Sequence, residues 1–359
     1  MGDPLDTVLC RMLGCRAPIV QTAMGWIATP ELVAASGEAG AFGFLAGAVL
    51  NPDQVKATIR RVKELTDRPF GVNFHMFQPG AAQIVETLIA ERVRAVSFGR
   101  GPDAAMVKRF RDAGILCVPT VGAAKHAKKM VELGVDMITV QGGEGGGHTG
   151  AVASTVLLPQ VLDAVKVPVI AAGGFADGRG LAAALAFGAV GIAMGTRFLM
   201  TQESAPPEHI KARYVKAGTD DIVVSTKVDG LPQRMIRNKL LDRIEREAGL
   251  GIWKRGVESG LAMKKQSGAS FADLFKAAQG MRSHGGLTIA QAMTAAAAPM
   301  MIQKAVVDGD ADNGLMATGL VAGRLGDLPS CRDLISSIVA EARERIAALT
   351  GANALSGAA

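Results

Sequence analysis

Short apolar runs alternate along the chain with longer segments whose apolar residues recur at helical spacing. Most of the apolar runs end at glycine or another small residue, so each is typical of a buried strand that runs into a turn. The predicted strands are Pro18–Met24, Phe42–Gly47, Phe70–Met76, Ala95–Gly99, Leu116–Val121, Met137–Gly143, Val169–Gly174 and Gly191–Thr196. Eight strand–helix units in about 200 residues favour a closed (β/α)8 TIM barrel, an α/β fold, over an open doubly wound sheet.

The helices between the predicted strands carry start and stop signals. Asn51-Pro52-Asp53 opens one of them with a cap residue, a proline and a first-turn acid, and several others end at glycine. The segments Asp103–Gly114 and Ala123–Gly134 follow the same pattern. These signals support helices packed around the predicted barrel.

After the eighth strand the pattern changes. Residues from about 202 to 305 are rich in Lys, Arg, Met and Ala, and we expect helices and no strand there, for example Arg234–Gly249 and Phe271–Gly280. Two further helices are predicted at Leu315–Gly326 and Ser330–Leu349. We therefore predict a barrel over residues 1–222, an inserted helical lobe over 223–307, and a return to the barrel over 308–359.

Composition limits the classes of protein that fit. The chain has 359 residues, of which 49% are hydrophobic, enough to bury one large core. The net charge of +6 permits anionic ligands, but no Lys/Arg tract accompanies it and only one Tyr and two Trp are available for stacking on bases. Nucleic-acid binding is therefore not expected.

Cysteine usage and hydropathy indicate a cytoplasmic protein. The four cysteines form neither a disulfide framework nor a zinc-ligand spacing. Apolar stretches are interrupted well before the roughly 18 residues that a membrane span needs, and no signal peptide is evident. The sequence leaves the oligomeric state open, with a homodimer as one possibility.

Two turns on neighbouring predicted strands form a candidate phosphate site. In a barrel enzyme the site lies at the carboxyl ends of the strands, often with a phosphate after strands seven and eight. Strand seven ends at Gly173 and Gly174, where the main chain can approach an anion, and Asp177 can cap the helix that follows. Strand eight ends at Gly195 and Thr196, which offer N–H groups and a hydroxyl. Together the two turns predict that a phosphate is bound.

A glycine-rich loop, QGGEGGGHTG, follows strand six and contains His148. Imidazole changes its charge near neutral pH, so His148 is a candidate general base or substrate hydrogen-bond partner. A loop histidine tied to a backbone carbonyl is the alternative. His75, at the end of strand three, is a weaker candidate for the pocket wall.

Strands one and three contribute further candidates. Ala23 and Met24 lie where the main chain could meet the edge of a flat cofactor, although simple barrel packing explains them as well. Asn73 places an amide at an otherwise apolar strand end, where burial is costly unless a partner is found.

At these residues the chain resembles the nitronate monooxygenase family. The resemblance runs through PIVQTAMG, RPFGVNF, the GGHTG loop, IAAGGFADGRG, IAMGTRF and MATGLVAGRL, so it spans nearly the whole chain. It implies FMN as cofactor, a TIM barrel with a helical substrate lobe, and catalysis by His148. It also implies FMN contacts at Ala23, Met24, Asn73, Gln141, Gly147, Gly173, Gly174, Gly195 and Thr196, and no metal.

The resemblance predicts FMN-dependent oxidation of alkyl nitronates by dioxygen to a carbonyl compound and nitrite. One departure matters: Thr120 stands where some relatives carry a Lys, which puts electron donation by NAD(P)H in doubt. An NAD(P)H-dependent FMN reductase acting on quinones or enoyl thioesters stays open as an alternative. So does a barrel that binds a phosphate ligand without catalysis or without redox chemistry.

Overall fold

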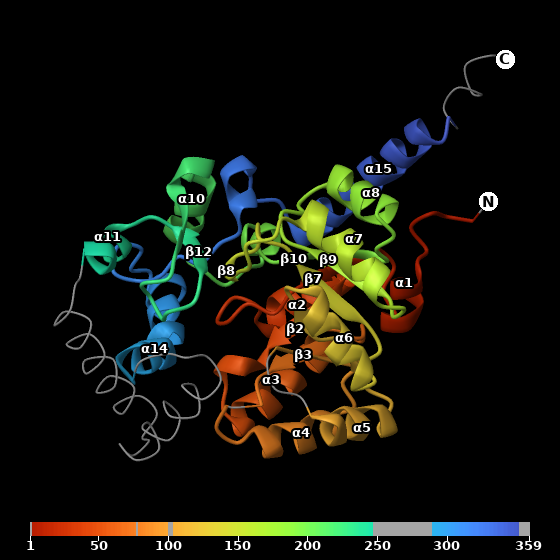
Figure 1. Ribbon diagram of the computed structural model, residues 1–359, viewed down its shortest axis with the longest axis horizontal. Helices are drawn as coiled ribbons and strands as arrows, with labels where there is room; N and C mark the ends of the chain where they lie inside the picture. The colour runs from red at the N-terminus through yellow and green to blue at the C-terminus, as the bar shows by residue number, and fades with distance from the viewer. Residues whose placement is uncertain (1, 77, 100–102, 247–288, 352–359) are drawn as a thin grey trace.

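A closed parallel barrel forms the body of the molecule in the computed structural model, which describes residues 2–76, 78–99, 103–246 and 289–351 (Figure 1). Its sheet has nine strands in the order β5-β4-β3-β2-β1-β10-β9-β7-β6. The strands are β1 (Ile19–Gln21), β2 (Phe42–Ala46), β3 (Gly71–Phe74), β4 (Ala95–Phe98), β5 (Leu116–Cys117), β6 (Thr120–Val121), β7 (Ile138–Gln141), β9 (Val169–Ala172) and β10 (Gly191–Met194). The predicted (β/α)8 TIM barrel is confirmed.

The fifth predicted strand is interrupted, and its two halves together close the barrel. The run Leu116–Val121 forms two short strands, β5 and β6, of which β5 pairs with β4 and β6 pairs with β7. Between them Val118 donates its N–H to Val96 O at 2.8 Å, and Pro119 O accepts from Thr139 N at 2.8 Å. Proline has no N–H of its own, so the ladder is interrupted there while the chain still bridges both neighbours.

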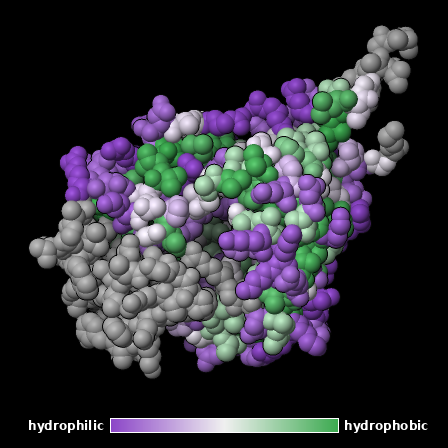
Figure 2. Space-filling view, viewed as in Figure 1, coloured by the Kyte–Doolittle hydropathy of each residue, from purple (hydrophilic) through white to green (hydrophobic). Residues whose placement is uncertain are grey.

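Helices pack around the barrel, and the first of them shares with strand residues a hydrophobic cluster that no other described helix joins. The helices are α1 (Val8–Leu13), α2 (Pro30–Ala39), α3 (Pro52–Leu65), α4 (Ala81–Ala90), α5 (Ala104–Asp112), α6 (Ala124–Glu132), α7 (Ser154–Ala164), α8 (Gly178–Ala186) and α15 (Cys331–Leu349). Asn51 caps α3 as predicted, in a reciprocal capping box with Gln54. Helix α15 packs against α8 and α2, so the end of the chain completes the helical layer. Figure 2 shows hydrophilic and hydrophobic side chains interspersed over the visible face.

The segment after β10 contains strands that the sequence did not predict. After α9 (Thr196–Leu199), α10 (Glu208–Lys216) and η2 (Thr219–Asp221), the antiparallel strands β11 (Ile222–Ser225) and β12 (Gln233–Ile236) pair, and β12 also pairs with β8 (Gly147–His148). The expectation of no strand between 202 and 305 is therefore wrong. The two strands are four residues each, and β12 also pairs with β8 far away in sequence, so local periodicity does not reveal them.

The remaining elements modify two more expectations. The predicted helix Arg234–Gly249 begins as β12, and its helical part is α11 (Lys239–Arg246). Residues 315–319 run alongside β12, with a bridge between Met235 and Ala317, and only η3 (Leu320–Arg324) is helical in the predicted Leu315–Gly326. Helix α14 (Ile289–Val306) is present, whereas Phe271–Gly280 lies outside the described residues. No helix in the described part of the chain is long and apolar enough to cross a membrane.

Candidate active site

A cavity of about 520 Å³ opens at the carboxyl ends of the barrel strands. All ten residues that the sequence singled out line it: Ala23, Met24, Asn73, Gln141, Gly147, His148, Gly173, Gly174, Gly195 and Thr196. His75 and Thr120 line it too. Six separate strand ends are therefore brought to one place, as expected for a barrel enzyme.

The turn after β9 has the geometry of an anion site. Gly173 and Gly174 have φ angles of 93° and 84°, a region in which a Cβ would be strained. Successive N–H groups in such a turn point to one side and make a concave seat for an anion. Asp177 caps α8 by accepting from Gly180 N at 2.9 Å, as predicted, so the positive end of that helix is adjacent.

The turn after β10 contributes Thr196. Its hydroxyl oxygen accepts a hydrogen bond from Gly319 N at 2.7 Å, so its own proton remains available to donate to an anion. Helix α9 begins at Thr196, and the first N–H groups of a helix have no intrahelical partner. Because Ala193 pairs with Ala172, the two turns belong to neighbouring strands.

The glycine-rich loop is braced from within. The Glu144 carboxylate accepts from Ser154 N at 3.0 Å and from Ser154 Oγ at 2.9 Å, and Arg234 Nη2 donates to Gly143 O at 2.8 Å. A Cβ on Gly146 would lie 2.4 Å from the Thr318 carbonyl carbon, so protein packing requires that glycine. Protein packing does not require glycine at Gly147, because a Cβ there would meet no described atom within 4 Å. Its φ of 64° nevertheless favours glycine.

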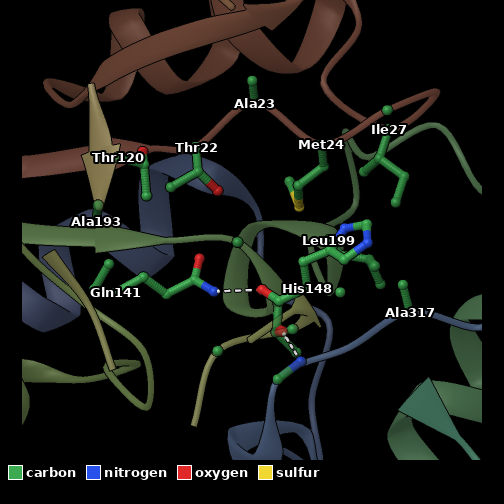
Figure 3. A pocket seen from close by; sticks show the side chains of 18 of the residues that line it. Thr22, Ala23, Met24, Ile27, Thr120, Gln141, His148, Ala193, Leu199 and Ala317 are labelled. Atoms are coloured by element: carbon green, nitrogen blue, oxygen red, sulfur yellow. Dashed lines mark hydrogen bonds between the residues drawn. The ribbon is translucent and has the colours of Figure 1, made fainter. Parts of the chain in front are cut away.

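His148 is held at the cavity wall by its main chain and its ring (Figure 3). Its carbonyl accepts from Gln141 Nε2 at 2.9 Å, the contact drawn as a dashed line in Figure 3. Its Nε2 lies 2.8 Å from Asp229 Oδ2, and the ring points into the cavity on the side of Met24 and Ile27 in that view. The alternative of a histidine tied by its ring to a backbone carbonyl is therefore not what the structure shows.

Asp229 is a buried anion. Its side chain is 2% exposed, and it accepts from Leu231 N at 3.0 Å and from Gln233 Nε2 at 2.5 Å besides its contact with His148. Burial alone would raise the pKa of the Asp229 carboxyl. The hydrogen bonds from His148, Leu231 and Gln233 outweigh burial, and the pKa lies below its ordinary value.

Two predicted contact residues already have protein partners. Asn73 Nδ2 donates to Ser97 O at 3.1 Å, so its amide does not depend on a ligand to be satisfied. The Gln141 side-chain amide donates to the His148 carbonyl and so orders the loop. Both still line the cavity and retain hydrogen-bonding capacity toward it.

Trp26 joins the barrel to the added lobe. It follows β1 with φ 65°, in the left-handed region that non-glycine residues rarely adopt. Its indole Nε1 donates to Pro299 O on α14 at 3.1 Å. Strain of this kind persists where surrounding contacts fix the conformation, and here the residue lines the cavity.

Sequence reasoning missed several residues of this cavity and its support. Ala317, Thr318 and Gly319 line it, but their segment was assigned to a helix. Asp229 and Gln233 were missed because they reach His148 across 81 and 85 positions. The Asp229-Gly230 pair signals a turn, yet a turn signal says nothing of what the carboxylate contacts.

The geometry fits a flavin mononucleotide. The turns after β9 and β10 bring glycine main chain and the Thr196 hydroxyl to the cavity, where a phosphate could bind, and Gly147 leaves room for a ring to lie against the main chain. No group of side chains that could hold a metal ion is present in the described residues. The glycine turns and the Thr196 hydroxyl at the cavity suit an anionic organic cofactor.

Comparison with known proteins assigns the family. The family model described as nitronate monooxygenase matches residues 6–88 and 76–341. The chain belongs to the nitronate monooxygenase family. Members of this family are oxidoreductases and flavoproteins, so the protein is an oxidoreductase of a flavin-dependent family.

Curated relatives of this chain carry the names of two different activities. A (3aS,4S,5R,7aS)-5-hydroxy-7a-methyl-1-oxo-octahydro-1H-indene-4-carboxyl-CoA dehydrogenase of Rhodococcus jostii is 45% identical over 96% of this chain and 98% of its own. A protein of the same name from Mycobacterium tuberculosis is 46% identical over 94% and 96%. A probable nitronate monooxygenase of Staphylococcus saprophyticus is 30% identical over 67% of this chain and 81% of its own.

Solved structures agree with the fold. FabK of Thermotoga maritima superimposes with a TM-score of 0.78 at 31% identity, covering 96% of this chain and 98% of its own. A nitroalkane oxidase of Streptomyces ansochromogenes gives a TM-score of 0.74 at 28% identity, covering 95% and 99%.

Proposed function

We propose that the protein is an FMN-dependent dehydrogenase of a cyclic carboxylic acid carried as its CoA thioester. The observation that carries the proposal is the His148 imidazole, paired with the anionic Asp229, in the same cavity as the phosphate-binding turns. The dehydrogenase relatives support the substrate class because they match at 45% and 46% identity over nearly the full length. The nitronate monooxygenase relative matches at 30% over 67% of this chain.

The chemistry needs a base beside a two-electron acceptor. A hydrogen on the carbon next to a thioester carbonyl is acidified, and His148 takes it as a proton. The electron pair of that bond forms the new double bond with the adjacent carbon, which loses its hydrogen together with two electrons. Bound FMN supplies the acceptor for this hydride equivalent. The product is the α,β-unsaturated thioester, two hydrogens lighter than the substrate.

The cavity wall also bears on the electron donor. Thr120 lines the cavity at the position where the family resemblance places a Lys in some members. A threonine adds no positive charge beside a reduced flavin. This fits a reaction in which the thioester, and not a pyridine nucleotide, supplies the electrons.

The test mixes the FMN-loaded protein anaerobically with cyclohexanecarboxyl-CoA, a hydrindane carboxyl-CoA, or the matching free acids. The thioester should bleach the flavin absorbance and yield a product two hydrogens lighter by mass spectrometry, while the free acid and NADH should not. Flavin that is bleached by NADH or by a nitronate, and left oxidised by both thioesters, contradicts the proposal.

Nitronate oxidation by dioxygen is the second candidate. The family model and the Staphylococcus relative favour it, and the same His148 would hold the anionic substrate. Oxygen uptake and nitrite release with ethyl nitronate would establish it, and their absence in a protein that oxidises the thioester would remove it.

Replacement of His148 tests its role in either reaction, as the base toward a thioester or as the group that holds a nitronate. His148→Ala should lower kcat by about 10²–10⁴-fold, the usual contribution of a general base, while FMN remains bound because the phosphate turns are untouched. His126→Ala, on the exposed face of α6, is the matched control and should keep full turnover. Full activity of His148→Ala, with FMN content measured by absorbance, would remove His148 from the mechanism.

A further inference from the structure

His148 is attached to the strands of the added lobe. It pairs with Gln233 in the antiparallel ladder between β8 and β12, and the next residue, Thr149, donates its N–H to Pro232 O at 3.0 Å. The β11–β12 hairpin therefore fixes the backbone of His148. The same hairpin carries Asp229 in its turn, where Gly230 N bonds to Thr226 O at 2.9 Å.

The Asp229 carboxylate determines which ring nitrogen of His148 carries a proton. Oδ2 of Asp229 lies 2.8 Å from Nε2 of His148, and an ionised carboxylate can only accept hydrogen bonds. If Nε2 carried no proton, its lone pair would point at a lone pair of the Asp229 carboxylate, and the two would repel each other. Nε2 must therefore be protonated, which leaves Nδ1 as the nitrogen that can take a proton.

Gln233 keeps Asp229 in place for this contact. Its Nε2 donates to Asp229 Oδ2 at 2.5 Å, and Leu231 N occupies Oδ1 at 3.0 Å, so both carboxylate oxygens are fixed. Gln233 Nε2 also lies 3.4 Å from His148 Nε2, and it lines the cavity. The carboxylate is therefore oriented before any substrate enters.

We infer that Asp229 is a positioning residue: it holds His148 as the Nε2–H tautomer, with Nδ1 as the proton acceptor, and Gln233 orients it. When His148 takes a proton, the imidazolium lies against a carboxylate that is 2% exposed, where water and salt screen the attraction least. The inference rests on the proposed function for its kinetic consequence. The tautomer itself does not depend on any substrate.

Nitrogen-15 NMR of histidine-labelled protein tests the tautomer directly. The His148 signals, assigned by their loss in His148→Gln, should show protonated Nε2 and unprotonated Nδ1 when the ring is neutral. In Asp229→Asn the amide can donate to Nε2 as well as accept from it, so the Nδ1–H form should appear. A wild-type ring protonated at Nδ1 overturns the inference, even where the variant fails to fold.

Kinetics test the consequence. Asp229→Asn should lower kcat by about 100-fold or more, in the range of general-base effects, and change KM by no more than about threefold, with FMN content retained. Gln233→Leu keeps the Asp229 carboxylate but removes the amide that donates to it. Its kcat should fall about tenfold, the effect expected for the loss of one hydrogen bond. Asp220→Asn is the matched control because Asp220 is exposed on η2.

The two proposals fail separately. Wild-type kcat in a folded, FMN-loaded Asp229→Asn overturns the positioning role while leaving thioester oxidation in place. A protein that oxidises no thioester, yet shows the Nε2–H ring converted by Asp229→Asn, loses the proposed function and keeps the positioning role.

Discussion

At the scale of single residues, the Thr196 hydroxyl has one role in the protein, and we predict a second role for it toward the cofactor. It accepts from Gly319 N, a buried contact that joins the turn after β10 to the segment before η3. Without that acceptor a buried N–H would be left unsatisfied, at a cost of about 1–3 kcal/mol. The same hydroxyl has one proton left for a phosphate oxygen.

Replacement of Thr196 separates these two roles. Thr196→Val keeps the volume but removes the oxygen, so it should lower the free energy of unfolding of the apoprotein by about 1–3 kcal/mol in urea titrations. It should also weaken FMN binding, measured by quenching of flavin fluorescence. Thr196→Ser retains the hydroxyl and should stay near wild type in both. Equal FMN affinity in all three proteins would argue against a phosphate contact at this position.

Single residues also show what the sequence could tell. The place of Gly173, Gly174 and Thr196 at the cavity could be predicted, because each belongs to a short turn motif at the end of a strand. Asp229 could not, because its role depends on a hairpin that brings it to His148 across 81 positions.

At the scale of elements, the cap of α8 links the candidate phosphate site to the C-terminal segment. Asp177 Oδ2 accepts from Arg179 Nη2 at 2.7 Å and from Arg324 Nη2 of η3 at 3.0 Å. Burial alone would raise the pKa of Asp177. The hydrogen bonds from Gly180 N, Arg179 and Arg324 outweigh burial, and the pKa lies below its ordinary value.

This lowered pKa predicts how stability depends on pH. Because the folded pKa is below the unfolded one, about 3.9, the stabilisation by Asp177 is complete above that value and is lost as pH falls through the folded pKa. Asp177→Asn keeps a capping side chain but loses the charge, so it should melt below wild type at pH 7. The difference in Tm should shrink as the pH is lowered toward 3. A constant difference across that range would assign the effect to the cap alone.

Elements were predictable where local periodicity decides them. The barrel helices bury one amphipathic face each, so their spacing predicts them. The strands β11 and β12 are short and pair with each other, β12 pairs with β8, and the extended run before η3 pairs with β12. Tertiary pairing determines those conformations, so the predicted helix Leu315–Gly326 is wrong over residues 315–319, and only η3 is helical within it.

At the scale of the whole molecule, the C-terminal helix α15 packs against the start of α8, a helix from the middle of the barrel chain. Gly178 opens α8, and a Cβ there would lie 2.5 Å from Ala342 N and 2.6 Å from Ile338 O. Its own N–H donates to Glu341 Oε2 at 2.8 Å. Barrel closure by a C-terminal helix was predictable from the pattern, but this close approach was not.

Gly178→Ala should therefore weaken the packing of α15 against α8. Overpacking against the backbone of α15 should lower the free energy of unfolding by about 1–3 kcal/mol, read from urea denaturation. Gly326→Ala is the control, since a Cβ there meets no described atom within 4 Å. If both variants unfold like wild type, α15 can shift without cost and the crossing is not tightly packed.

The strained Trp26 gives the protein an optical reporter of its own. Its indole bonds to α14 and faces the cavity, and the chain has two tryptophans, of which the other is Trp253. With Trp253 replaced by Phe, ultraviolet emission would come from Trp26 alone. Arrival of a yellow chromophore in the cavity would then dim that emission through energy transfer, and rupture of the indole bond to Pro299 would shift its wavelength.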